Sequence, residues 1–192
     1  MIARERDRYE AFVIACFGDP GLAASRELVD VPVIGIAGAA IHLSCLVAHQ
    51  FSIVSVLPRV KPMLLDLVRR YGLTDRCASI RTTGLGVLEI EQDWDRAERL
   101  MIAEAQAAID EDGAEAICLG CAGMGPLQER MQAKVSVPVL DGTGAVIKLA
   151  ESLHDLGIHT AKVRAFQDPE PKEYVGDEFP FVRRLSARIT VG

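Results

Sequence analysis

An internal repeat restricts the fold of this chain more than any other feature of its sequence. Residues 13–22 (VIACFGDPGL) resemble residues 118–127 (CLGCAGMGPL), and residues 31–43 (VPVIGIAGAAIHL) match residues 137–149 (VPVLDGTGAVIKL) at seven positions. The identical pairs of the first match are Cys16 with Cys121, Gly18 with Gly123, and Leu22 with Leu127. A repeat of this kind indicates one structural unit used twice. The sequence therefore predicts two pseudo-symmetric lobes, each with a strand that ends in Cys-X-Gly and a Val-Pro-led strand that feeds a longer helix.

Short apolar runs alternate with helical patterns along the chain, which is typical of an α/β protein with parallel sheets flanked by helices. The clearest helix is predicted from Asp93, an N-cap residue type, to Gly113, a residue type that ends helices. Strands are expected at residues 11–15, 33–36, 51–57, 78–80, 116–119 and 137–140. The predicted domains are a discontinuous first lobe (1–50 and 139–176), a second lobe (51–138) and a tail (177–192).

The two predicted lobes are unequal in length. About 70 residues separate Phe51 from Cys121, whereas fifteen residues precede Cys16. If the lobes are equivalent, the first lobe lacks its opening strands, and we expect a chain that is incomplete at its N-terminus. The first lobe is then expected to leave open a sheet edge that could pair with another chain.

Charge and composition exclude several classes of partner. With 27 acidic and 21 basic side chains and a net charge of −6, the chain has no general attraction for nucleic acid or for anionic lipid. The most apolar stretch, residues 31–48, is interrupted by Pro32, Gly35 and His42, which is unlike a membrane span. The first ten residues carry charges of both signs and lack the apolar segment of a secretory signal. We therefore expect a cytoplasmic protein with free thiols at its five cysteines and with neither nucleic acid nor a membrane as partner.

Two of the cysteines, Cys16 and Cys121, occupy equivalent positions in the repeat. Ligands of open parallel sheets collect beyond the carboxyl ends of the strands, and both cysteines are expected there. The backbone amides that follow them are those of Phe17, Gly18, Ala122 and Gly123. Free amides at the start of a helix favour anions, so these groups are candidates to bind a carbonyl or carboxylate oxygen of a substrate.

Pseudo-symmetry would bring the sulfur atoms of these two cysteines to opposite sides of one cleft. A thiolate on one side can remove a proton from a carbon while a thiol on the other side returns one, which inverts the stereocentre. The loop amides would stabilise the enolate that forms in between. This chemistry requires neither a metal nor an organic cofactor, and none is expected.

The chain resembles the hydantoin and allantoin racemases of the aspartate/glutamate racemase superfamily over most of its length, to about Gly176. The segments that carry the resemblance are ACFGDPGL around Cys16, LGCAGM around Cys121, GLGVLEI at 84–90, VPVLDG at 137–142 and KLAESL at 148–153. The resemblance implies a cofactor-independent racemase of 5-substituted hydantoins or allantoin that self-associates, with Cys16 and Cys121 as the catalytic pair. Members of the family begin with a strand that carries an Asn-Pro-Asn type motif, which nothing here matches.

The resemblance also implies substrate contacts on the loops after the two cysteines and near Val56 and Leu57, at the end of the first strand of the second lobe. Two further candidates come from the residues themselves. Asp19 lies in the loop after Cys16, where it could contact substrate or cap a helix that starts near Pro20. Thr143 opens the last predicted helix and could likewise cap that helix or contact a ligand.

Three alternative functions remain open on the sequence alone. One is another enzyme of the same superfamily, such as an amino-acid racemase, a maleate isomerase or a decarboxylase. The second is a shortened, catalytically silent protein for ligand binding or assembly. The third is a thiol-redox protein that uses the C-x-x-C of Cys118 and Cys121, although their strand positions are expected to point to opposite faces.

Overall fold

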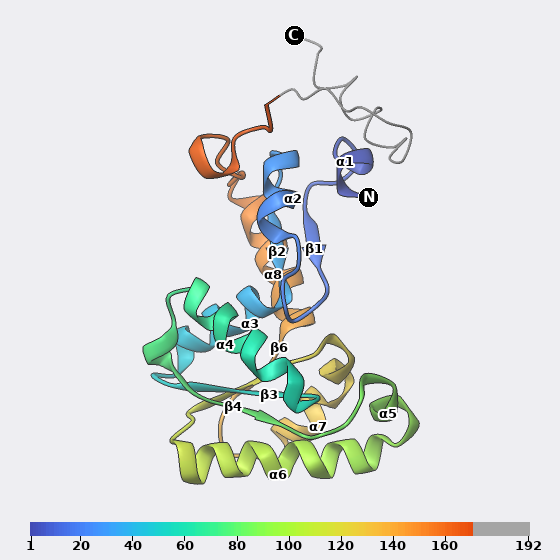
Figure 1. Cartoon of the computed structure of the whole chain (residues 1–192), viewed down its shortest axis with the longest axis vertical. Helices are drawn as coiled ribbons and strands as arrows, with labels where there is room; N and C mark the ends of the chain where they lie inside the picture. Colours follow the sequence, from blue (N-terminus) through green and yellow to red (C-terminus); the bar gives the residue numbers. More distant parts are fainter. Residues whose placement is uncertain (171–192) are drawn as a thin grey trace.

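Within residues 1–170, six strands form two separate parallel sheets (Figure 1). In the computed structural model, which describes residues 1–170, the smaller sheet pairs β1 (Phe12–Ile14) with β2 (Val33–Gly35). The larger sheet has the order β4-β3-β5-β6 and consists of β3 (Phe51–Ser55), β4 (Cys77–Thr82), β5 (Ala116–Leu119) and β6 (Val139–Asp141). Every pairing between these strands is parallel. The predicted α/β fold with parallel sheets is confirmed, and each expected apolar run overlaps one of the six strands.

Helices and short turns connect the strands. The α-helices are α1 (Ile2–Glu5), α2 (Leu22–Leu28), α3 (Ile36–Val47), α4 (Lys61–Arg70), α5 (Val87–Gln92), α6 (Trp94–Asp112), α7 (Gln128–Gln132) and α8 (Gly142–Asp155). The 3₁₀ turns are η1 (Pro58–Val60), η2 (Thr74–Arg76), η3 (Ala122–Leu127) and η4 (Arg164–Phe166). None of the helices within residues 1–170 is long and apolar enough to cross a bilayer.

The predicted helix between Asp93 and Gly113 is confirmed as α6. The Asp93 carboxylate accepts a hydrogen bond of 2.9 Å from the amide of Arg96, so it caps the first turn. Gly113 ends the helix with a φ of 78°, a left-handed conformation that glycine adopts without strain.

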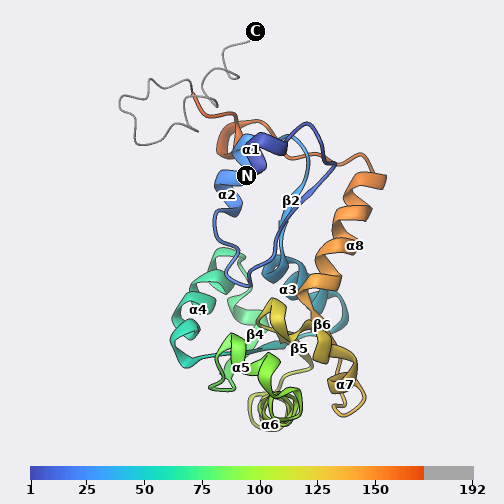
Figure 2. The same ribbon diagram turned by 90° about the vertical axis from the view of Figure 1, so that its right-hand side faces the viewer.

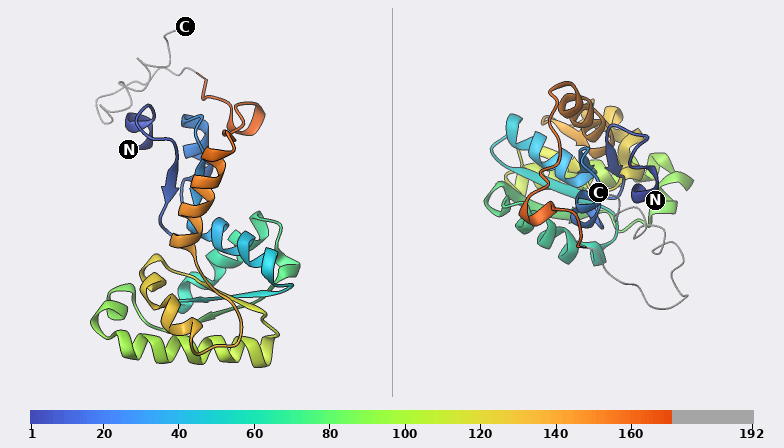
Figure 3. Two further views of the ribbon diagram at one scale, coloured as in Figure 1. Left: turned by 180° about the vertical axis from the view of Figure 1, so that it is seen from behind. Right: turned by 90° about the horizontal axis from the view of Figure 1, so that it is seen from above.

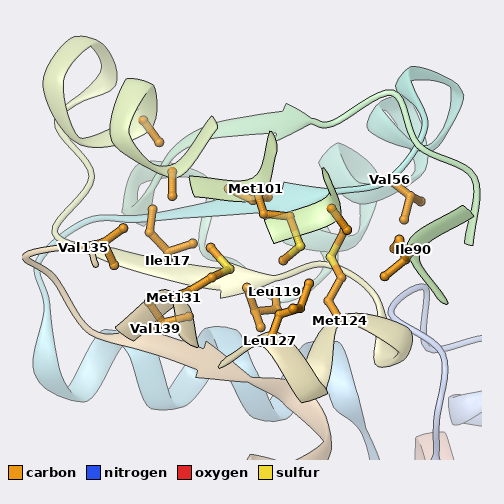
Figure 4. Close-up of a cluster of buried hydrophobic side chains, with 14 of the residues drawn as sticks. Val56, Ile90, Met101, Ile117, Leu119, Met124, Leu127, Met131, Val135 and Val139 are labelled. Atoms are coloured by element: carbon orange, nitrogen blue, oxygen red, sulfur yellow. The ribbon is translucent and has the colours of Figure 1, made fainter. Parts of the chain in front are cut away.

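The four-stranded sheet is covered by helices on both faces. Its strand β3 is buried along its whole length, as expected of a parallel strand between two helical layers. Ile53 packs toward α3 and α4, while the next residue, Val54, packs toward α6. Figure 4 shows the cluster on the α6 side, where Met101 meets Ile117 and Leu119 of β5. Each face therefore has its own apolar core, and the carboxyl ends of four strands are fixed at one edge of the sheet.

The helices that follow the two Val-Pro-led strands are exchanged between the sheets. Helix α3 follows β2 of the small sheet but packs on the four-stranded sheet, in the same core cluster as Phe51 and Cys118. Helix α8 follows β6 of the large sheet but runs back along β1 and β2, as Figures 2 and 3 show. We call β1, β2, α1, α2 and α8 the two-stranded lobe, and β3 to β6 with α3 to α7 the four-stranded lobe.

Two segments lie elsewhere than in their predicted domain ranges. Residues 139–141 were expected in the first lobe, but they form β6 and pair with β5 of the larger sheet. Helix α3 lies within the predicted range 1–50, yet its apolar face belongs to the core of the four-stranded lobe. The assignment of residues 51–138 to the second lobe stays a prediction. The tail at 177–192 and the end of the first-lobe range, 171–176, lie outside the described residues.

Helices α3 and α8 cross very closely where they begin. A Cβ at position 142 would lie 2.6 Å from the carbonyl oxygen of Ile36, which is closer than such atoms approach in proteins. Because the clash would be with backbone, a side-chain rotation cannot relieve it. The crossing therefore requires the glycine found at this position, which begins α8 directly after β6.

Replacement of Gly142 by alanine should lower the free energy of unfolding by about 1–3 kcal/mol, since the two helices must move apart to accept the methyl group. Urea-induced unfolding followed by circular dichroism measures this loss. Gly144→Ala is the matched control, because its Cβ would lie 3.6 Å from Asp141 Oδ2, an ordinary contact. Equal stability of the two variants would contradict the close crossing.

Candidate functional site

Cys16 lies in the exposed loop that follows β1. The amide of Asp19 donates a hydrogen bond of 3.0 Å to the carbonyl oxygen of Cys16, which closes a tight turn. The loop descends toward the four-stranded lobe (Figures 1 and 2), where a Cβ at Gly18 would lie 3.1 Å from Met63 Sδ of α4. The turn therefore carries an exposed thiol next to the opposite lobe.

Cys121 lies at the equivalent place after β5, where it begins η3. The amide of Met124 donates to the carbonyl oxygen of Cys121 at 3.0 Å, which matches the bond from Asp19 to Cys16 at the same repeat offset. The preceding Gly120 is held by the buried Ser55, whose hydroxyl donates to its carbonyl oxygen at 2.9 Å. The two cysteines thus share one local geometry, as the repeat predicts.

Burial and a neighbouring thiol both raise the pKa of Cys121. Burial raises the pKa of Cys121 above its ordinary value, a backbone hydrogen bond from Gly123 opposes this rise, and the charge of Cys16 adds to it. Cys16 belongs to the two-stranded lobe and Cys121 to the four-stranded lobe. The thiol that adds to the raised pKa of Cys121 therefore comes from the opposite lobe.

The carboxylate of Asp19 caps a helix other than the predicted one. Its carboxylate is only 4% exposed and lies at the N-terminus of α3. It accepts hydrogen bonds from the amides of Ala37 (3.2 Å) and Gly38 (2.9 Å) and from the hydroxyl of Tyr71 (2.5 Å). Asp19 therefore caps α3 instead of a helix near Pro20, and both of its carboxylate oxygens accept hydrogen bonds from protein donors.

Val56 was predicted near the substrate but packs in the core. Its side chain is 6% exposed and belongs to the apolar cluster on the α6 side of the sheet, where Figure 4 shows it opposite Ile90. Strand alternation turns this residue inward. Leu57, the next residue, is half-buried at the start of η1, at the carboxyl edge of the sheet, and its contact with substrate stays a prediction.

The remaining predicted contacts differ in what their side chains can do. Phe17 is buried in the core, so only its backbone amide is available for the predicted role. Ala122 and Gly123 form the first turn of η3 beside the Cys121 sulfur. Thr143 is exposed on the first turn of α8, but it does not cap that helix, because Asp141 accepts the hydrogen bond from Gly144 at 2.8 Å.

Cys118 and Cys121 do not form a facing pair of thiols. Cys118 is fully buried in the cluster beneath α3, whereas Cys121 packs against the cluster on the α6 side. Burial raises the pKa of Cys118 to about 12, although a hydrogen bond with Ser44 opposes the rise. Such a thiol is almost entirely protonated at neutral pH, which disfavours redox chemistry by this C-x-x-C motif.

Two partly exposed apolar side chains border the cysteine loops and were not singled out in the sequence. Val87 of α5 is 46% exposed, and its Cγ1 lies 3.7 Å from where a Cβ at Gly123 would be. Met63 of α4 is 45% exposed and adjoins Gly18. Val87 follows the carboxyl end of β4, so the position of GLGV after a strand is the signal that could have identified it.

Metal-binding side chains are not clustered in the described part of the chain. Within residues 1–170, no group of three His, Cys, Asp or Glu side chains could hold an ion. His42 on α3 is exposed, with its Nδ1 2.7 Å from the carbonyl oxygen of Gly38 and its ring edge-on to Tyr71. Its surroundings are those of a surface helix residue.

Comparisons with known proteins identify relatives over most of the chain. A family model described as Asp/Glu/Hydantoin racemase matches residues 1–150. A hydantoin racemase of Pseudomonas sp. (strain NS671) is 48% identical over 172 residues, which are 90% of this chain and 69% of the relative. A hydantoin racemase of Paenarthrobacter aurescens is 49% identical over 166 residues, 86% of this chain and 70% of that one. Among solved structures, allantoin racemase from Klebsiella pneumoniae superposes with a TM-score of 0.87 at 40% identity, covering 93% of this chain and 73% of that one.

Thiol labelling should separate the cysteines of the native protein. With iodoacetamide and peptide mass spectrometry, Cys16 should react readily because it is exposed, and Cys118 should stay unlabelled because it is buried and its pKa is raised to about 12. As the pH is increased, the labelling rate of Cys121 should still be rising above pH 9.0, which equals the usual pKa of a thiol. The reason is that the raised pKa of Cys121 shifts formation of its reactive thiolate to higher pH. Labelling of Cys118 as fast as that of Cys121 would contradict the structure.

Proposed function

Because the chain belongs to the Asp/Glu/hydantoin racemase family, we propose that it racemises 5-substituted hydantoins or allantoin with a pair of thiols, Cys16 and Cys121. The observation that carries this proposal is the repeated turn, in which each cysteine follows a parallel strand and accepts the same backbone hydrogen bond. The effect of Cys16 on the pKa of Cys121 supports a common cleft. The hydantoin and allantoin racemases among the relatives support the substrate class.

The reaction moves one proton off the stereocentre and one proton onto it. The thiolate of one cysteine takes the proton, so a C–H bond breaks and an S–H bond forms, and the electron pair moves to the adjacent ring carbonyl as an enolate. The thiol of the other cysteine then gives its proton to the opposite face of the same carbon. Atoms and charge balance, because the pair begins and ends with one thiol and one thiolate, in exchanged places.

The loops that carry the thiols also supply the other groups that this reaction needs. The amides of Phe17 and Gly18 on one side, and of Ala122 and Gly123 on the other, stabilise the enolate oxygen as hydrogen-bond donors. The raised pKa of Cys121 keeps its proton in place at neutral pH, which suits the donor role in the resting protein. The substrate of opposite hand is processed with the roles of the two thiols exchanged.

Substitution of each thiol tests the mechanism. Cys16→Ser and Cys121→Ser should each reduce racemisation by about 10²–10⁴-fold, since each removes one proton-transfer group. In D₂O, wild-type protein should incorporate deuterium at the ring carbon of both enantiomers. Each single variant should lose inversion but keep exchange with one enantiomer, because one functional thiol remains. Polarimetry and proton NMR measure the two processes.

Cys118→Val is the matched control for these variants. The repeat has valine at the equivalent position, Val13, so a side chain of this size suits the end of such a strand. This variant should keep its racemase activity. Full racemisation by either serine variant would exclude the two-thiol mechanism, and ligand binding by wild-type protein without any isotope exchange would favour a catalytically silent protein.

A further inference from the structure

The carboxylate of Asp19 connects the Cys16 turn to a helix of the opposite lobe. Its Oδ1 accepts from the amide of Ala37 and its Oδ2 from that of Gly38, in the first turn of α3. The backbone amide of the same residue donates to Cys16. Asp19 adopts a φ of 47°, a left-handed conformation that few non-glycine residues adopt. The hydrogen bonds of its carboxylate and of its amide hold it in this conformation. Cys16 is thus three residues away from an anchor on the four-stranded lobe.

The repeat shows that this anchor is specific to one half of the protein. Asp141 caps α8 from the position directly before that helix, and the equivalent position before α3 is Gly35. A Cβ at Gly35 would lie 2.0 Å from Oδ1 of Asp19, so the Asp19 carboxylate occupies the space that a side chain at residue 35 would need. In the Cys16 half, the cap therefore comes from the thiol loop itself, whereas in the Cys121 half it comes from Asp141, the last residue of β6.

Tyr71 gives the Asp19 carboxylate a third donor from the four-stranded lobe. This residue ends α4, and its hydroxyl donates to Oδ2 at 2.5 Å. Its ring lies edge-on to His42 of α3 and packs against the apolar clusters of both lobes. Burial is the largest cause that raises the pKa of Tyr71, and the hydrogen bond to Asp19 is the second. The phenol therefore remains a donor at neutral pH.

The geometry points to Asp19 and Tyr71 as a pair of positioning residues that fix the Cys16 thiol relative to Cys121 by joining its turn to the four-stranded lobe. This inference rests on the proposed function, because it assigns the pair to one of the two catalytic thiols. Asp19 and Tyr71 act through the turn and do not touch substrate. A small displacement of a reacting group can lower a reaction rate by a large factor. The hydrogen bonds of Asp19 therefore affect the catalytic rate more than they affect substrate binding.

The test uses the full chain with Tyr71→Phe, which removes one oxygen atom and keeps the ring. We expect kcat to fall about tenfold with KM within about twofold of wild type, because the displaced thiol transfers protons less well. The iodoacetamide reaction of Cys16 should become at least about threefold faster as its turn loosens, while that of Cys121 stays unchanged. Asp19→Asn weakens all three hydrogen bonds that the carboxylate accepts. It should therefore lower kcat and speed up Cys16 labelling by larger factors than Tyr71→Phe does.

Tyr9→Phe is the matched control, since Tyr9 is exposed and packs only on Phe12 among the described aromatic rings. It should leave kcat and both labelling rates at wild-type values. Unchanged Cys16 labelling in Tyr71→Phe, or an equal change at Cys16 and Cys121, would overturn the positioning role. The labelling rates test the positioning role of Asp19 and Tyr71 even if the protein has no racemase activity. Racemisation by Cys16→Ser would instead refute the proposed two-thiol function and leave the positioning role standing.

Discussion

The close crossing of α3 and α8 is the constraint on which the rest of the structure depends. Each helix leaves the sheet that precedes it and packs on the other, and the two meet where the backbone of Ile36 touches Gly142. The strands β2 and β6 are therefore held at a fixed separation. Because the cysteine loops follow strands that pair with β2 and β6, this contact sets where both thiols lie.

Pseudo-symmetry gives the two halves the same turn but not the same support. Cys121 is held by a strand in the middle of a four-stranded sheet and by the hydroxyl of Ser55 beneath it. Cys16 follows β1, which pairs with β2 in the smaller sheet, and its loop reaches across to α3 and α4. A central strand provides rigid support, whereas a short sheet needs added contacts from the opposite lobe. The asymmetry of the hydrogen bonds at Asp19 and Asp141 follows from this difference.

The sequence predicted the order of strands and helices well, because an internal repeat indicates that the same order of elements occurs twice. Local patterns located the six strands and helix α6, and the equivalence of Cys16 and Cys121 followed from their offset. The sequence assigned the helix after Gly142 to the first lobe, where α8 lies, but it did not predict that α3 packs on the larger sheet. Apolar periodicity shows that a helix has a buried face but not which sheet that face covers.

Side-chain roles at the site were harder to predict than positions. Val56 was placed near substrate from its position at the end of a strand, but the alternation of that strand turns it into the core. Asp19 was recognised as important, yet its partners are eighteen or more residues away along the chain. Val87 and Met63 come from elements that are distant in sequence from both cysteines. Such contacts depend on tertiary structure, which the residues of one loop do not specify.

The helix exchange also has a consequence for how the chain acquires its structure during synthesis. Strand β1 precedes α8, the helix that runs along it, by more than a hundred residues of chain. The first strand must therefore wait for more than a hundred residues before its covering layer exists. Contacts between such distant segments slow folding, since the intervening loop must close first. A nascent chain of this protein thus carries β1 without its covering helix until α8 has been made, and α8 then completes both halves at once.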